Sequence, residues 1–130
     1  MQSAARALAR QTILVIDDDV FFRTLVRGSL LKAGFEVVEA SNGLEGVHLL
    51  MRAPIDLVIT DMIMPEYAGV ETILRIRQLC PELKILAMSG ADSRDNYLQL
   101  AAQIGAGVTL EKSWIPDLLL ASVRSLLKPA

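Results

Sequence analysis

The stretch ILVIDDD, residues 13–19, is the most informative part of the sequence, because an apolar run ends abruptly in three carboxylates. The stretch DLVITDMIMPEYAG, residues 56–69, repeats this pattern with an apolar run that ends at Asp61. Short apolar runs rich in branched residues are typical of strands that are buried on both faces of a parallel sheet. Both stretches therefore predict a central strand that delivers acidic side chains to one edge of a sheet.

Outward from these two stretches, strand-like and helix-like segments alternate along the chain. The five predicted strands are Thr12–Asp17, Phe35–Ala40, Asp56–Asp61, Lys84–Ser89 and Gly107–Glu111. The predicted helices run from a cap at Asp19 to Gly34, from Ser41 or Asn42 to Pro54, and over about 70–80, 94–104 and 115–127. This alternation predicts an α/β fold, a doubly wound five-stranded parallel sheet of the flavodoxin-like type with strand order 2-1-3-4-5.

Apolar residues in the first two helices recur in steps of three and four, which places them on one face of each helix. The inward set of the first helix is Phe22, Leu25, Val26, Ser29, Leu30 and Ala33. Arg23 and Arg27 are then expected to face water. In the second helix, Leu44, Val47 and Met51 are expected to face the sheet.

Length and composition fit one domain with a substantial core. The chain has 130 residues, of which 52% are hydrophobic, and a formal net charge of −2. Residues 1–11 are predicted to be a flexible leader and residues 12–128 a single domain, with no output domain in this chain. The absence of basic runs argues against a nucleic-acid partner, and the absence of an 18-residue apolar run argues against a membrane span. The single cysteine, Cys80, fits a cytoplasmic protein.

Polar side chains follow the predicted strands at their carboxyl ends. Asp17 and Asp18 follow the first strand, and Asp61, Ser89 and Lys112 end or follow the third, fourth and fifth strands. The carboxyl ends of parallel strands meet at one edge of the sheet, so these side chains should converge. Clustered carboxylates bind a cation or take up protons, and oxygen ligands favour Mg²⁺. Asp61 is then a candidate nucleophile for phosphoryl transfer, with Ser89 and Lys112 as candidates to stabilise the transferred group.

The joint order and spacing of several motifs resemble the receiver domains of two-component response regulators, in particular stand-alone chemotaxis regulators. The motifs are ILVIDDD (13–19), DLVITDMIMPEYAG (56–69), ILAMSG (85–90), the IGAG turn (104–107) and Lys112. The resemblance implies that Asp61 accepts a phosphoryl group from a histidine kinase or a histidine phosphotransfer protein. It also implies a signalling protein rather than an enzyme, one that assists only its own phosphorylation and slow dephosphorylation. Its output would pass to a downstream protein target or a separate output domain.

The resemblance also assigns roles to individual residues. Asp18 would bind Mg²⁺ directly and Asp17 through water, while Asp61 and the backbone carbonyl of Ile63 would complete the protein ligands. Ser89 matches a hydroxyl that moves toward the phosphoryl group, and Lys112 matches a lysine that pairs with it.

Three features depart from, or qualify, the family pattern. The family usually has proline after the lysine, whereas Ser113 and Trp114 follow Lys112 here, so the geometry of this loop is in doubt. Thr109 stands where an aromatic ring often turns inward on activation, which predicts a weaker or different relay of the signal. Ile63 and Ala91 flank the phosphoryl position and cannot orient water, so the phosphorylated state is predicted to be long-lived.

Two other functions are weighed beside the leading one. A haloacid-dehalogenase-type phosphohydrolase would use Asp17 and Asp19 as a D-x-D pair, but it needs a longer chain and a second acidic pair after the lysine. A binding-only pseudo-receiver would keep the fold without phosphorylation, as Thr109 and the missing proline would allow. A flavin-binding function is disfavoured because the carboxylates at 17–19 would repel its phosphate.

Overall fold

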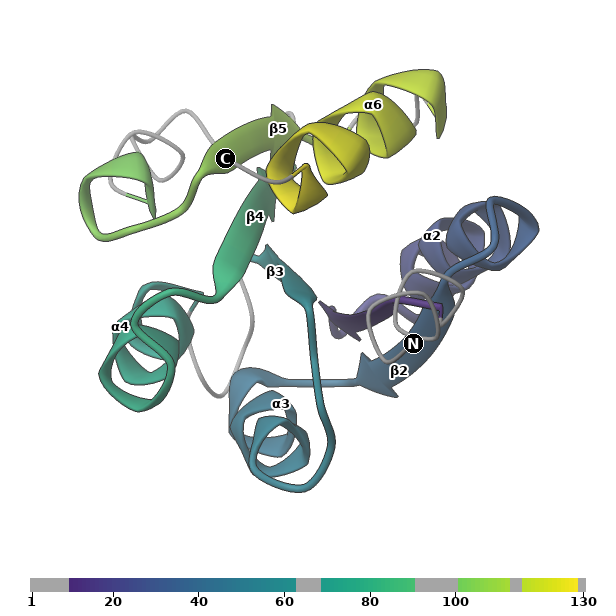
Figure 1. The fold of residues 1–130 in the computed structure, drawn as a ribbon. Coiled ribbons are helices and arrows are strands. Elements are labelled where there is room, and N and C mark those ends of the chain that lie inside the picture. The colour runs from purple at the N-terminus through teal and green to yellow at the C-terminus, as the bar shows by residue number, and fades with distance from the viewer. Residues whose placement is uncertain (1–9, 63–68, 91–100, 113–115, 129–130) are drawn as a thin grey trace.

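The computed structural model describes residues 10–62, 69–90, 101–112 and 116–128, and these form a parallel sheet covered by helices on both faces (Figure 1). The strands are β1 Thr12–Ile16, β2 Glu36–Ala40, β3 Leu57–Asp61, β4 Lys84–Ser89 and β5 Val108–Glu111. Their order is β2-β1-β3-β4-β5, and every neighbouring pair is parallel. The predicted α/β doubly wound fold is confirmed.

Helices α2 and α6 lie on one side of the sheet, and α3 and α4 lie on the other (Figure 1). Their bounds are α2 Val20–Lys32, α3 Gly43–Leu50, α4 Gly69–Leu79 and α6 Pro116–Leu127. Of the helix predicted over 94–104, only the part from residue 101 is described, and residues 101–103 are helical. Most of the predicted leader also lies outside the described residues.

Burial on both faces explains why the strands are continuously apolar instead of alternating. Leu14 and Ile16 of β1 belong to the core beneath α3 and α4. Ile13 and Val15 of the same strand belong to the core beneath α2 and α6. Successive side chains point to opposite faces, and both faces are dry, so each position requires an apolar residue.

Side-chain caps set the starts of the first two described helices. Asp19 caps α2 by accepting the Phe22 N–H at 3.1 Å, and Asn42 caps α3 by accepting the Glu45 N–H at 2.8 Å. Gly34 follows α2 with a φ of +99°, which is a left-handed conformation that favours glycine. The predicted cap at Asp19 and end at Gly34 are therefore confirmed.

The predicted inward face of α3 is wrong at two of its three positions. Val47 is buried, but Leu44 and Met51 are 54% and 68% exposed. The helix instead turns a glycine toward the sheet, since a Cβ on Gly46 would lie 2.4 Å from Cδ1 of Ile16. This close approach rotates the helix so that Gly43, Gly46, Val47 and Leu50 form its buried face.

Candidate functional site

The register of the strands brings the predicted site residues to one edge of the sheet. Ile16 of β1 is paired with Thr60 of β3, so Asp17 and Asp61 each follow directly after this pair. Asp61 is paired in turn with Met88, the residue before Ser89. Ser89 is paired with Glu111, the residue before Lys112. Residues up to 95 positions apart in the sequence thus lie at the same edge of the sheet, as predicted for the carboxyl ends of these strands.

Three carboxylates gather at this edge. One oxygen each of Asp17, Asp18 and Asp61 lies within 4.8 Å of the others. Asp17 and Asp61 are 3% and 5% exposed, whereas Asp18 is exposed to solvent. Carboxylate oxygens at this spacing, open on one side to water, are a donor set suited to a hard divalent cation such as Mg²⁺.

Lys112 provides the positive charge inside this cluster. Its Nζ lies 2.8 Å from Oδ2 of Asp17 and 3.5 Å from Oδ2 of Asp61. Its backbone N–H donates to the carbonyl of Ser89 at 2.6 Å, which fixes the start of the side chain beside the end of β4. The predicted proximity of Lys112 to the acidic residues is therefore present in the structure.

The ion pair between Asp17 and Lys112 acts in opposite directions on the pKa values of its two members. Burial is the dominant effect on Asp17 and raises its pKa above the ordinary 3.8, although the bond from Lys112 lowers it. Burial also acts to lower the pKa of Lys112, but the bond to Asp17 and the charge of Asp61 outweigh it and raise that pKa. Burial dominates at Asp17 because its side chain is only 5% exposed, whereas that of Lys112 is 13% exposed. The protein therefore holds Asp17 as a costly buried charge.

The turn that carries the acidic residues is fixed by its own side chains. Oδ1 of Asp17 accepts the N–H of Asp19 at 2.9 Å, and the carboxylate of Asp19 caps α2. Asp19 thus has a structural role in the turn and is not among the clustered carboxylates Asp17, Asp18 and Asp61.

Arg23 was predicted to face water, and this prediction is wrong. Its side chain is 15% exposed, its Nη1 donates to the backbone carbonyl of Asp17 at 2.6 Å, and its Nε donates to Oε1 of Glu39 at 3.1 Å. Helical periodicity places Arg23 on the flank of α2 but carries no signal that a strand end lies beside that flank. Arg27, which also pairs with Glu39 at 3.3 Å, is about half exposed, as expected.

Phe22 is a second residue whose role the sequence did not reveal. It was predicted as a core residue and is 8% exposed, but its ring also lies under the lysine of the site, with Nζ of Lys112 4.6 Å from the ring centre. No local sequence pattern indicates this contact, because the two residues are 90 positions apart.

Gly69 packs the start of α4 against the end of β3. A Cβ on Gly69 would lie 2.5 Å from both the carbonyl oxygen of Asp61 and Cα of Met62. Its N–H points to the carbonyl of Met62 at 3.2 Å. Only glycine allows this approach of a helix to the backbone of the predicted nucleophile.

The other predicted residues divide into described and undescribed ones. Ser89 is fully buried at the end of β4, and Thr109 is half-buried on β5, opposite Ala87. Ile63, whose carbonyl was predicted to bind the metal, lies outside the described residues, as do Ala91, Ser113 and Trp114. The prediction about the geometry of the loop after Lys112 therefore stays a prediction.

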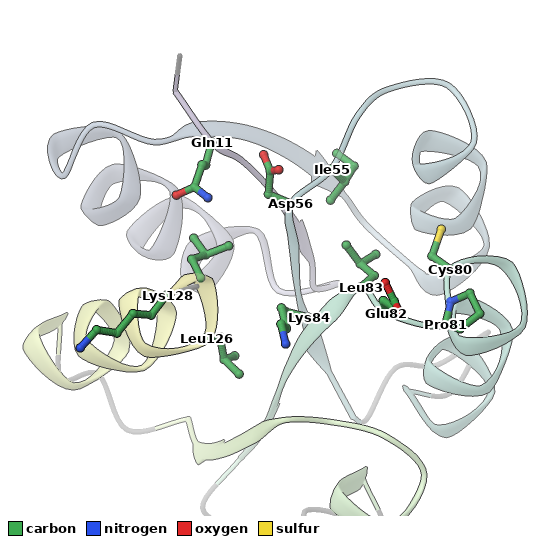
Figure 2. Close-up of a pocket in the computed structure, with 11 residues that line it drawn as sticks. Gln11, Ile55, Asp56, Cys80, Pro81, Glu82, Leu83, Lys84, Leu126 and Lys128 are labelled. Atoms are coloured by element: carbon green, nitrogen blue, oxygen red, sulfur yellow. The ribbon is translucent and has the colours of Figure 1, made fainter. Parts of the chain in front are cut away.

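A separate cavity of about 750 Å³ lies at the opposite edge of the sheet (Figure 2). Gln11, Asp56 and Lys84, which precede or begin β1, β3 and β4, line it together with the end of α6. None of the clustered carboxylates lines this cavity, so it is separate from the candidate site.

Comparison with known proteins identifies the family. Residues 13–124 match the model of the response regulator receiver domain. This chain belongs to that family. The receiver domain is 33% identical over 116 residues to the chemotaxis protein CheY of Bacillus subtilis, covering 88% of this chain and 96% of CheY. It is 34% identical over 118 residues to the response regulator MprA of Mycobacterium sp. (strain KMS), covering 89% of this chain.

Solved structures agree with this assignment. The receiver domain superposes on the chemotaxis protein CheY4 of Vibrio cholerae with a TM-score of 0.84 at 28% identity, over 92% of this chain and all of CheY4. It superposes on the receiver domain of NtrX from Brucella abortus with a TM-score of 0.85 at 27% identity, over 91% of this chain and 99% of that one. Domains of this family act in two-component signalling and are not metabolic enzymes.

Several curated relatives are longer than this chain. The chain spans 50% of MprA and 23% of the hydrogenase transcriptional regulatory protein HoxA of Cupriavidus necator. Among the described helices, none is both long enough and apolar enough to cross a bilayer.

Proposed function

We propose that this receiver domain accepts a phosphoryl group on Asp61 with the help of bound Mg²⁺. The observation that carries the proposal is the convergence of Asp17, Asp18, Asp61 and Lys112 at the carboxyl edge of the sheet. A carboxylate nucleophile needs neighbours that neutralise an incoming phosphoryl group and hold it in place, and this edge provides them.

The donor set fits Mg²⁺, which prefers oxygen ligands and usually keeps several waters. Asp18, the exposed member of the cluster, would bind the ion directly, Asp17 would bind it through water, and Asp61 and the carbonyl of Ile63 would complete the protein ligands. When bound, Mg²⁺ would neutralise negative charge on the phosphoryl oxygens. Without such a cation, three carboxylates at this distance repel one another.

Asp61, Lys112 and Ser89 would each have a separate role in the transfer. A carboxylate oxygen of Asp61 forms a new bond to phosphorus as the bond from phosphorus to the donor breaks. Lys112 exchanges its contact with Asp61 for a phosphoryl oxygen, and the hydroxyl of Ser89 donates to another. The role of the protein is mainly to position these groups and neutralise charge, as phosphoryl transfer requires.

The donor would be a phosphohistidine on a kinase or a phosphotransfer protein, and the signal would leave through contacts with a target protein or an output domain. The names of the relatives, a chemotaxis protein and a transcriptional regulatory protein, cover both kinds of output. Because Ile63 and Ala91 cannot orient an attacking water, we expect the phosphorylated form to be long-lived.

The alternative functions have less support. The comparisons indicate receiver domains and not phosphohydrolases, and Asp19, the second member of the D-x-D pair, caps a helix. A binding-only pseudo-receiver does not need an acidic cluster with a paired lysine, yet this chain has both. The strand register also puts Asp61 at the end of the central strand, between β1, which precedes Asp17, and β4, which ends at Ser89.

Incubation with acetyl phosphate and Mg²⁺ tests the proposal. We expect wild type to acquire one acid-stable, base-labile phosphoryl group, located at Asp61 by mass spectrometry, and Asp61→Asn to acquire none. Asp56→Asn is the matched control, because Asp56 lies at the opposite edge and should leave labelling unchanged. Labelling of Asp61→Asn, or a phosphoryl group at Asp17, would overturn the assignment.

A further inference from the structure

The ammonium of Lys112 contacts two carboxylates and one aromatic ring in the described part of the chain. The carboxylates of Asp17 and Asp61 lie on one side, and the ring of Phe22, 4.6 Å from Nζ, lies on another. A cation within about 6 Å of a ring centre is attracted by the negative face of the ring.

Burial makes this contact stronger than it would be on an open surface. The side chain of Lys112 is 13% exposed, and Phe22 is 8% exposed. Water therefore competes weakly for the ammonium at this point, and a desolvated cation–π contact is worth more than an exposed one.

The place of the ring is fixed by the same turn that carries the acidic residues. The backbone N–H of Phe22 donates to the cap carboxylate of Asp19, and the backbone N–H of Asp19 donates to Oδ1 of Asp17. The ring packs in the core formed with α6, so its face cannot turn away easily. The neighbouring Phe21 is 74% exposed and lies outside that core.

We propose that Phe22 is a positioning residue for phosphoryl transfer, one whose ring face holds the Lys112 ammonium in place for the incoming group. This inference rests on the proposed phosphorylation of Asp61. A ring is suited to this task because it is uncharged: it attracts the ammonium without competing with a metal ion for ligands and without repelling a phosphoryl group. When Asp17 and Asp61 become engaged by Mg²⁺ and phosphorus, Phe22 still faces the ammonium.

A graded change of the ring tests the proposal with little change in packing. Phenylalanine analogues with one, two or three fluorines, placed at position 22 by nonsense suppression, progressively weaken the negative face of the ring. We expect the rate of labelling by acetyl phosphate to fall stepwise, to about one tenth for Phe22→Leu. The same analogues and Phe21→Leu are the matched controls at position 21 and should leave the rate unchanged.

A second variant shows whether the effect passes through Lys112. In a Lys112→Met background, Phe22→Leu should slow labelling no further, because the ammonium that the ring holds is gone. An equal slowing in both backgrounds would assign Phe22 a packing role only and would overturn the inference.

A spectroscopic measurement on the unphosphorylated protein is independent of activity. In protein labelled with ¹³C-lysine, the Cε protons of Lys112, assigned through Lys112→Arg, should be shifted upfield by the ring and should lose this shift in Phe22→Leu. The absence of any ring shift in wild type would overturn the contact itself.

The outcomes separate this inference from the proposed function. If wild type is not labelled at Asp61, the proposed function fails and the positioning role fails with it, whatever the ring shift. If wild type is labelled but the fluorinated series has no effect on the rate, only the inference about Phe22 fails.

Discussion

At the scale of single residues, Asp17 shows how this site trades stability for charge. Burial raises the pKa of Asp17, so ionising it in the folded protein is harder than in the unfolded chain. Without divalent cation at neutral pH, we expect Asp17→Asn to increase the free energy of unfolding by about 1 kcal/mol, measured by urea denaturation. Asp19→Asn is the control, because Asp19 is exposed and asparagine caps a helix about as well as aspartate.

The raised pKa of Asp17 also determines how its contribution to the stability of the folded protein changes with pH. Because the folded-state pKa of Asp17 lies above 3.8, the folded protein binds more protons than the unfolded chain in that range, and stability falls as pH rises through it. The difference in free energy of unfolding between Asp17→Asn and wild type should therefore grow as pH rises above about 4 and vanish below that pH. A gap that is constant with pH would mean that the variant acts through packing alone.

Arg23 and Arg27 lie on the same helix and differ in one contact. Arg23 and Arg27 both pair with Glu39, but only Arg23 donates to the carbonyl of Asp17. Since hydrogen bonds from charged groups are worth about 1.5 to 3 kcal/mol, we expect Arg23→Met to lower the free energy of unfolding by that order. Arg27→Met removes an exposed pair and should lower it by less than about 1 kcal/mol. Equal losses in the two urea titrations would contradict the special role of Arg23.

At the scale of elements, the start of α4 and the end of β3 form one unit through Gly69. A Cβ at this position would overlap the backbone of Asp61 and Met62, so helix or strand would have to move. We expect Gly69→Ala to destabilise the fold by about 1 to 3 kcal/mol and to slow labelling of Asp61 by acetyl phosphate.

Gly28 provides the matched control for this substitution. It lies inside α2, and a Cβ there would have no neighbour within 4 Å. Gly28→Ala should therefore stabilise the protein by about 0.5 to 1 kcal/mol through helix propensity and leave labelling unchanged. A stabilising Gly69→Ala would show that the contact with Asp61 is not tight in solution.

At the scale of the whole molecule, the sheet brings together charges that repel one another until a cation joins them. A ligand that binds only the folded state adds about 1.4 kcal/mol to stability for each tenfold rise in concentration above its dissociation constant. We expect Mg²⁺ to raise the free energy of unfolding of wild type in this way, as measured by urea titrations at several Mg²⁺ concentrations.

Two variants define the source of this stabilisation. Asp61→Asn should lose most of the Mg²⁺ effect, whereas Asp56→Asn, at the opposite edge of the sheet, should keep it. The same gain in NaCl of equal ionic strength would show that screening, and not binding, is responsible.

The elements themselves could be predicted because their signals are local. Each predicted strand matches an observed one to within one residue at each end, and the cap at Asp19 could be read from the sequence. The face of α3 could not, because Gly46 contributes no apolar side chain to the pattern although it makes the closest approach to β1. The periodicity of apolar side chains cannot reveal this face, because the packing depends on the absence of a side chain at Gly46.

The amino-acid order alone determined the parallel sheet, its strand order and the edge at which Asp17, Asp61, Ser89 and Lys112 would meet, because strand ends in this topology share one edge. The contacts around these residues became visible only in the folded chain: Arg23 beside the carbonyl of Asp17, the ring of Phe22 beneath Lys112, and Gly69 against the backbone of Asp61. The physical reason is that these contacts depend on distances of a few ångströms between different elements, and such distances follow from how helices rotate and settle on the sheet.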